Sequence, residues 1–476
     1  MRTRLNIFSE FANSLFSHEL EYLLSVQNFS KSLNLNILNQ IYKNNTSVKT
    51  PKPFDTSVDK RTYSYMKNWI TETLLKIDVD HFFEWLISTE KKILTDVIVP
   101  TDESEILGNM HQMTSVNYNF IRFYELILYY RDYLMVRSRT KYIRVVMEFL
   151  EKNREHYFFL KEINNELDTI TAQIVKKTDL SVTEQNEAEQ FLSHTYYNET
   201  LDGYTRYRAV VRLTIFYYNN RLFDKQLIVY EHLDNLLKTP LFYSKRILSN
   251  YYANRAMMHS KLNEQILAEK YGYLSLRNKN SDYLFYLINL CGVLIKQDKK
   301  SDALKLMRDA IPELKNTNNN YYKIGFSSFY IRTLIINNQT EKAVNYATQY
   351  FEAYKKEIFE HRWHLYLSSY FYVLMQAEKY KKIISLSKRY NLVQKEKQRI
   401  DLPDYLPSIE FYSYAAEYLE GQISRDKLVG VFIKLTEPIL RDKYRSRRIV
   451  ELLDELSLQL PEEIKSIKKE LKKGNL

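Results

Sequence analysis

The chain has 476 residues, of which 45% are hydrophobic and 27% charged, a balance that supplies an apolar core and argues against a globally disordered chain. Glycine and proline number only eight and nine, so a fold that needs many tight turns between strands is disfavoured and long helices are expected. The formal net charge of +11 permits an acidic partner, whether nucleic acid, an anionic membrane surface or an acidic protein.

The predicted cellular location follows from the absence of long apolar segments in the sequence. No run approaches the roughly 18 apolar residues that a membrane-spanning helix requires. Ser9, Glu10 and Asn13 interrupt what would have to be the apolar part of a secretory leader. We therefore expect a cytoplasmic protein without a membrane span.

Residues 1–190 are predicted to form an N-terminal helical region. Apolar residues recur at helical spacing in four stretches. The four stretches cover residues 1–43, 61–98, 110–152 and 155–174. One or two helices are expected in the first stretch, and one long helix or two shorter ones in the third. Segment 44–60, with Pro51 and Pro53, is predicted to be a loop. Polar segment 176–189 is predicted to be a connection that ends in a helix cap, because it contains Ser-Val-Thr-Glu.

Residues 191–400 contain a repeat with a period of 40 residues. Ala303, Ala343 and Ile383 occupy equivalent places, and short polar turns are expected at 297–300 and 337–340. The apolar set at i, i+3, i+4 and i+7 recurs three times, as Leu287, Leu290, Cys291 and Leu294, then Ser327, Tyr330, Ile331 and Leu334, then Leu367, Tyr370, Phe371 and Leu374. A period of this length with two helices per unit predicts an all-α fold, a helical-hairpin solenoid.

These units resemble degenerate tetratricopeptide repeats, in which a small residue at the start of the second helix lets the pair approach closely. Ala303 and Ala310 occupy such places, whereas Cys291, Ile331 and Phe371 stand where the family has glycine. The resemblance implies a superhelix whose inner groove is lined by the first helices. A groove that is cationic and aromatic suits an acidic or extended peptide. By resemblance, the residues of this partner-binding groove are Tyr252, His259, Lys296, Arg332, Tyr372 and Gln376.

Residues 401–476 are predicted to form C-terminal helices that cap the solenoid and end in a basic tail. Helices are expected near 409–419, 425–440 and 447–458, followed by a charged helix that begins at Pro461. Terminal units of a solenoid need one polar face, which suits this composition.

The sequence shows no pattern that predicts a catalytic residue, a metal site or a cofactor. The glycines stand too far apart for a phosphate-binding loop. His361 and His364 are three residues apart, whereas helical zinc peptidases need four, so a solvated helix start is favoured. Asp78 precedes an apolar helix and is expected to cap it. Cys291 lies among apolar residues, which favours core packing.

Basic residues interleaved with aromatic ones are a candidate nucleic-acid surface. Arginine and lysine at i, i+4 and i+7 could follow phosphates while tyrosine rings stack on bases. The residues concerned are Arg131, Arg137, Lys141, Arg144, Arg206, Arg208 and Arg212. The alternative is an ordinary solvated helix face, because tyrosine is abundant throughout the chain, with 41 residues.

Three functions are compatible with these observations. The first is a non-enzymatic scaffold or adaptor that binds a peptide or partner protein in a helical groove. The second is a nucleic-acid-binding regulator that uses the basic and aromatic helices of the N-terminal half. A helical nuclease ranks last, because Arg255 and His259 are closer together than the corresponding pair in such enzymes.

Overall fold

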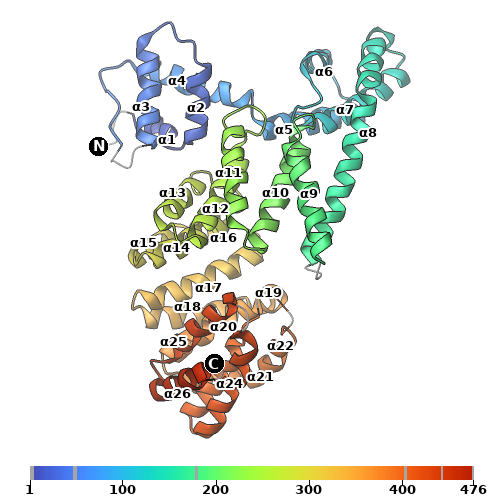
Figure 1. Cartoon of the computed structure of the whole chain (residues 1–476). Helices are drawn as coiled ribbons and strands as arrows, with labels where there is room; N and C mark the ends of the chain where they lie inside the picture. Colours follow the sequence, from blue (N-terminus) through green and yellow to red (C-terminus); the bar gives the residue numbers. More distant parts are fainter. Residues whose placement is uncertain are drawn as a thin grey trace. The chain divides into compact units, whose positions relative to one another are not determined.

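The computed structural model describes residues 5–46, 51–176, 181–400, 402, 405–440 and 443–473. These residues form 26 α-helices and no strand (Figure 1), which confirms the predicted all-α class. The chain divides into two compact units, Met1–Asn280 and Ser281–Leu476. Each unit is described by itself below.

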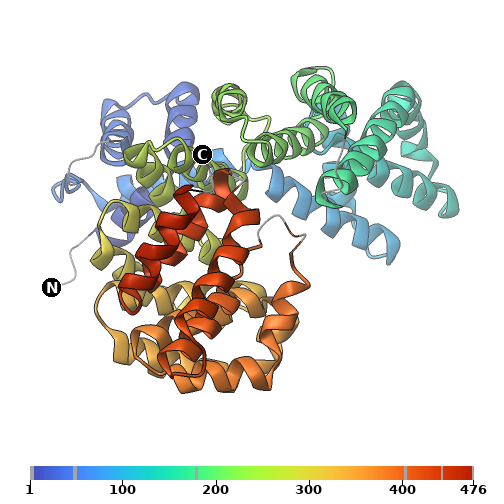
Figure 2. The same cartoon turned by 60° about the horizontal axis from the view of Figure 1, so that its bottom comes forward.

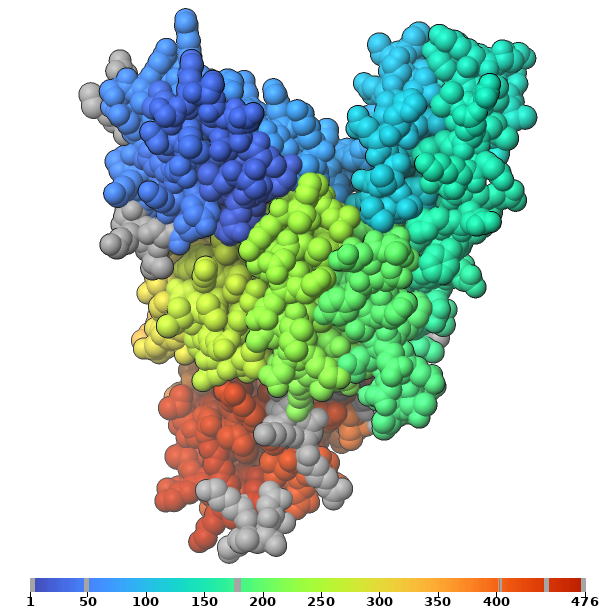
Figure 3. Space-filling view, turned by 45° about the horizontal axis from the view of Figure 1, so that its top comes forward, coloured from blue at the N-terminus to red at the C-terminus, as the bar shows by residue number. Residues whose placement is uncertain are grey.

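The first unit contains the helices α1 to α13. Their bounds are α1 (Asn6–Asn13), α2 (Ser17–Val26), α3 (Ser32–Thr46), α4 (Lys60–Leu75), α5 (Val79–Leu94), α6 (Pro100–Gln112), α7 (Phe120–Val136), α8 (Thr140–Lys176), α9 (Val182–Tyr197), α10 (Gly203–Asn219), α11 (Phe223–Leu236), α12 (Lys245–Lys261) and α13 (Gln265–Ser275). Two apolar clusters form its interior, and α8 contributes to both, with Leu160 in one and Leu167 in the other. Figure 3 shows that the surface of this unit is hollowed between α1–α4, in blue, and α6–α8, in cyan and teal.

Two predictions about the N-terminal helices were wrong in detail. Residues up to Thr46 form three helices rather than one or two. The helix expected over 155–174 is the second half of α8, which runs unbroken for 37 residues, about 55 Å. No glycine or proline interrupts this stretch, and the Asn153 amide donates to the Phe149 carbonyl one turn earlier, so the helix continues.

The two connections predicted in this region lie partly outside the described residues. Residues 47–50 of the expected loop and 177–180 of the polar segment are not described. The predicted cap is confirmed at Ser181, because its hydroxyl accepts from the Glu184 N–H and the Glu184 carboxylate accepts from the Ser181 N–H. The predicted extent of the connection was wrong, since residues 182–189 already belong to α9.

The second unit contains the helices α14 to α26. Their bounds are α14 (Tyr283–Lys296), α15 (Lys300–Asp309), α16 (Ile311–Asn316), α17 (Asn320–Ile336), α18 (Thr340–Ala353), α19 (Lys355–His361), α20 (Trp363–Gln376), α21 (Tyr380–Arg389), α22 (Leu392–Lys397), α23 (Ser408–Leu419), α24 (Arg425–Leu440), α25 (Lys443–Leu456) and α26 (Pro461–Lys473). The long helices pack as pairs, and α14, α17, α20 and α23 each contact the next. The helices predicted over 401–476 are confirmed, although part of that region lies outside the described residues.

The 40-residue period recurs in the turns between paired helices of this unit. Asp298, Asn338 and Glu378 each adopt a positive φ, at 62°, 57° and 54°. Asparagine and aspartate tolerate this left-handed conformation better than most residues, which suits a tight reversal at the first two positions. The predicted turns are confirmed, since α14 ends at Lys296 and α15 begins at Lys300, and α17 ends at Ile336 and α18 begins at Thr340.

Within the second unit, successive 40-residue repeats also form hydrogen bonds with each other at the same interval. The Tyr322 hydroxyl donates to the Asp282 carboxylate at 2.8 Å, and the Ser368 and Ser408 hydroxyls lie 2.6 Å apart. The twelve residues of the recurrent set are all buried. The sequence repeat therefore corresponds to a repeated packing arrangement.

Candidate functional site

Two side chains of the second unit, Arg332 and Tyr412, bond to one carboxylate, and Tyr372, which lies 40 residues from each in the sequence, lies against Arg332. Arg332 lies on α17, Tyr372 on α20 and Tyr412 on α23, so one comes from each of three consecutive first helices. The carboxylate belongs to Glu455 near the end of α25. Figure 2 shows the red C-terminal helices crossing in front of the yellow and orange helices of the same unit.

Both oxygens of Glu455 accept hydrogen bonds. The Arg332 guanidinium donates to Oε1 at 2.8 Å, and the Tyr412 hydroxyl donates to Oε2 at 2.6 Å. The Gln376 amide approaches the backbone carbonyl of the same residue at 3.5 Å. Charge-assisted bonds of this kind are stronger than neutral ones, so Glu455 is the polar anchor of α25 on this face.

Arg332 is held in place by two residues of the adjacent helix α20. Its Nε donates to the Ser369 hydroxyl at 3.1 Å, and its guanidinium carbon lies 4.9 Å from the centre of the Tyr372 ring. A cation over an aromatic face is attracted by the ring quadrupole. The guanidinium is therefore oriented toward the carboxylate by groups that belong to α20.

The electrostatics of this cluster keep its donors protonated. Burial lowers the pKa of the Arg332 guanidinium, but the Glu455 carboxylate together with Tyr412 and Tyr372 raises it by more, so the net shift is upward. Burial, followed by the Glu455 charge, raises the pKa of Tyr412 well above its usual value. The same two causes raise the pKa of Tyr372. At neutral pH, Arg332 is charged and both tyrosines are neutral.

The structure thus brings together three of the six predicted groove residues, Arg332, Tyr372 and Gln376. Lys296 is the last residue of α14 and is exposed. The sequence analysis missed Tyr412 and Glu455. Tyr412 follows Tyr372 by one repeat period and could have been found from the period, whereas no local pattern marks Glu455.

The other two predicted groove residues lie in the interior of the first unit, on α12. Tyr252 is 1% exposed and His259 is 3% exposed. The Tyr252 hydroxyl lies 2.5 Å from Nδ1 of His18 on α2, and Nε2 of His18 lies 3.1 Å from the Asp234 carboxylate on α11. His259 Nδ1 lies 2.5 Å from the Glu264 carboxylate. Their assignment to a partner stays a prediction.

Asp234, whose side chain is 25% exposed, is the charged group that the buried members of this cluster contact. It accepts from the Tyr251 hydroxyl at 2.5 Å and pairs with Lys238 at 3.2 Å. Burial raises the pKa of its carboxyl, but His18, Tyr251 and Lys238 together lower that pKa by a larger amount, so the net shift is downward. Burial raises the pKa of Tyr252. A carboxylate, an imidazole and a phenol are thus linked in a chain that ties α2 to α11 and α12.

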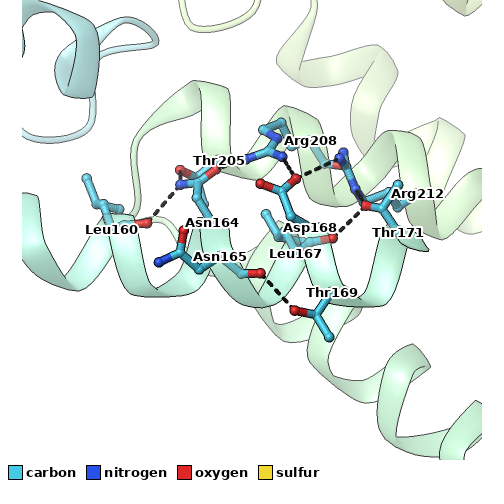
Figure 4. Close-up of polar contacts among 10 residues, drawn as sticks. All are labelled: Leu160, Asn164, Asn165, Leu167, Asp168, Thr169, Thr171, Thr205, Arg208 and Arg212. Atoms are coloured by element: carbon cyan, nitrogen blue, oxygen red, sulfur yellow. Dashed lines mark hydrogen bonds and ion pairs between the residues drawn. The ribbon is translucent and has the colours of Figure 1, made fainter. Parts of the chain in front are cut away.

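Part of the predicted nucleic-acid set is bonded to the helix beside it. Arg208 on α10 donates to Asn164 and Asp168 of α8, and Arg212 donates to Thr171 (Figure 4). These bonds join α8 to α10 across 40 to 44 residues of sequence. Both guanidinium groups therefore already have acceptors within the first unit.

The remaining members of that set also have intramolecular contacts. Arg206 is 3% exposed and donates to the Tyr196 carbonyl at 3.0 Å. Each of the other four contacts a carboxylate or a ring, as Arg131 with Asp132, Arg137 with Asp96, Arg144 with Glu148, and Lys141 over Tyr142. Arg144 is the most exposed of these three arginines, at 87%.

The polar groups that the sequence singled out elsewhere have structural contacts. Asp78 accepts from the N–H groups of Asp80 and His81, which confirms its predicted cap. His364 Nε2 lies 2.5 Å from Glu396, whose oxygens also accept from the first N–H groups of α23. Cys291 is buried, and burial raises the pKa of its thiol to about 12. Among the described residues, no three metal-capable side chains form a group.

Comparison with known proteins gives no family for this chain. No model of a known protein family matches the sequence, and no curated protein matches it. In the part of the chain that the structure describes, no helix has the length and apolar character that crossing a membrane requires.

Proposed function

We propose that this protein is a non-enzymatic scaffold or adaptor that binds a helical segment of a partner protein. The binding surface is the helix-binding face, defined as Arg332, Ser369, Tyr372, Gln376 and Tyr412 on α17, α20 and α23. These helices belong to a tetratricopeptide-like superhelix with a 40-residue period. The observation that carries the proposal is that two side chains related by the period, Arg332 and Tyr412, bond to one carboxylate of a helix, while Tyr372 lies against Arg332.

The chemistry of the helix-binding face suits an acidic helix. Arg332 is partly buried and pre-oriented by Ser369 and Tyr372, so little rotamer freedom is lost when it pairs with a carboxylate. Tyrosine adds a rigid hydrogen-bond donor beside it. The raised pKa values of Arg332 and Tyr412 keep both groups as donors, which favours binding over proton transfer.

The test is a selection of displayed amphipathic helices on the full-length chain. We expect enriched sequences to carry a glutamate or aspartate beside the apolar stripe, and binding to weaken when Arg332→Ala removes the guanidinium. Arg447→Ala is the matched control, because it removes the same charge from an exposed position of α25 that pairs with Glu451. Selected helices without a carboxylate, or equal loss in both variants, would refute the proposal.

A further inference from the structure

The outward side of α21 is basic along the length of the helix. Its inward side consists of Ile383, Ile384, Leu386 and Ser387, all of which are buried. An α-helix turns by about 100° per residue, so the cationic positions fall together on the other side. The residues on that side are Lys381, Lys382, Ser385, Lys388 and Arg389. No position of α21 carries an acidic residue, so this side presents charge of a single sign.

The corresponding helices of the two preceding repeats lack this concentration of charge. Helix α15 carries the exposed carboxylates of Asp302 and Asp309 among its lysine and arginine residues. Helix α18 carries those of Glu341 and Glu352. The single-sign surface therefore belongs to α21 itself and does not follow from the repeat.

A row of cations and rings continues this surface from α21 onto α22. The Arg389 guanidinium carbon lies 5.6 Å from the centre of the Tyr390 ring, and Lys395 Nζ lies 4.8 Å from the centre of the Phe359 ring. The two ring centres are 5.2 Å apart, and both rings are partly exposed. The row thus joins α19, α21 and α22, which lie close together in Figure 1. We define the basic–aromatic face as Phe359, Lys381, Lys388, Arg389, Tyr390 and Lys395.

The cations of this face are held only loosely within the chain. Lys381 lies 4.0 Å from the Glu420 carboxylate and Lys388 lies 3.9 Å from that of Glu417, and the two lysine side chains are 87% and 65% exposed. Arg208 of the first unit, by contrast, is 16% exposed and bonds directly to Asp168. Exposed ion pairs contribute little net free energy, so a phosphate can replace these carboxylates at small cost.

We propose that the basic–aromatic face binds single-stranded nucleic acid, with its cations on the phosphates and its rings against the bases. Proteins that bind single strands combine a cationic surface that follows the backbone with aromatic side chains on which bases stack. An acidic peptide requires the cations alone, whereas rings placed between cations suit a ligand that carries both charge and planar groups. This activity is separate from the scaffold function, because the helix-binding face lies on α17, α20 and α23.

The experiment is an anisotropy titration of the full-length chain against short labelled oligothymidylate and oligouridylate strands over a salt series. Binding of either strand supports the proposal, because phosphates and bases are common to both. We expect Lys388→Gln combined with Arg389→Gln to weaken binding about ten-fold at low salt. The slope of log affinity against log salt should fall by about 1.4, since each phosphate contact on a single strand accounts for about 0.7. Absence of binding at low ionic strength would overturn the proposal.

Two further double variants test whether binding is localised to this face. Lys305→Gln with Arg308→Gln is the matched control, because it removes the same two charges from exposed positions of α15 and should leave the affinity unchanged. Lys381→Gln with Lys395→Gln should weaken binding as much as the first pair, and it replaces that pair if circular dichroism shows a loss of helix. Equal losses in the α15 control, or no loss in either pair from the basic–aromatic face, would refute the assignment.

An abasic strand separates nucleic-acid binding from attraction to any polyanion. This strand keeps the phosphates of oligothymidylate but has no bases to stack, so it should bind about ten-fold more weakly. Polyglutamate should likewise compete poorly with the labelled strand. Equal binding of the abasic strand, or effective competition by polyglutamate, would show that the face recognises charge alone and fits an acidic protein, and the nucleic-acid proposal would fail.

Discussion

In each unit a predicted groove residue bonds to a helix that is distant in the sequence, α2 in the first unit and α25 in the second. The two contacts differ in how exposed their side chains are to solvent. In the first unit Tyr252 bonds to His18 of α2, and both side chains are at most 5% exposed. In the second unit Arg332 bonds to Glu455 of α25, and both side chains keep more than a quarter of their surface in solvent.

This difference separates a structural contact from an exchangeable one. A polar group in the interior has no water to replace a lost partner, so removal of one member leaves the others unsatisfied. Around Glu455, water can compensate in part for the loss of Arg332, which is partly exposed, whereas Tyr412 is fully buried and would lose its acceptor. The interior cluster should therefore determine stability, and the partly exposed cluster should determine what binds.

The largest effect is expected from Asp234→Ala, because its partners His18 and Tyr251 are buried, although the Asp234 side chain is itself 25% exposed. This change leaves His18, Tyr251 and Lys238 without their shared acceptor, and it should lower the free energy of unfolding by about 3 kcal/mol. Urea denaturation measures the change, and hydrogen exchange should locate it in α2 and α12. Asp132→Ala, at an exposed ion pair, is the control. Similar losses in the two variants would contradict the interior role.

A smaller loss is expected from Tyr252→Phe, which removes only the hydroxyl. His18 Nδ1 then lies buried without this partner, at a cost of about 1–2 kcal/mol. Denaturant midpoints of this variant and of Tyr65→Phe, at a half-exposed tyrosine, give the comparison. A midpoint unchanged from that of Tyr65→Phe would show that the hydroxyl contributes nothing.

Asp234 and Glu19 of the first unit should have opposite effects on stability as the pH falls. The pKa of Asp234 is lowered in the folded chain, so the unfolded chain takes up its proton first as the pH falls, and stability is lost. Burial raises the pKa of Glu19 above its usual 4.5, so its protonation on acidification favours the folded state. Melting temperatures across an acid pH series should decline less steeply in Asp234→Asn and more steeply in Glu19→Gln. The opposite slopes would refute these assignments.

Glu455→Gln should change stability less than either interior variant. The expected loss is about 1 kcal/mol, because the ion pair with Arg332 is partly solvated. Faster hydrogen exchange confined to α25 and its neighbours would support this, and Glu451→Gln provides the control. A loss as large as that of Asp234→Ala would remove the distinction between the two clusters.

The smallest effect is expected at the predicted nucleic-acid surface. Arg144→Ala removes an exposed i, i+4 pair with Glu148 and should cost about 0.3–0.5 kcal/mol. Because Arg208 and Arg212 already bond to α8, we expect no salt-dependent complex with labelled DNA or RNA that requires them. Binding with a steep salt slope that Arg208→Ala reduces would restore the nucleic-acid hypothesis.

Local patterns in the sequence determined much of the helical architecture. The i, i+3, i+4, i+7 spacing identified the buried faces of α14, α17 and α20, and the 40-residue period located their turns. These features depend on residues within one or two helical turns, so their signal is local. The same reasoning divided α8 incorrectly, because a polar stretch within a continuous helix resembles a boundary.

The tertiary structure alone decided which polar residues meet. Glu455 reaches Arg332 across 123 residues of sequence, and His18 reaches Tyr252 across 234. Helical periodicity identifies a face of one helix but carries no information about the helix that covers it. The sequence therefore predicted an all-α chain with a repeated face, while the occupation of that face by α25 depends on packing between distant segments.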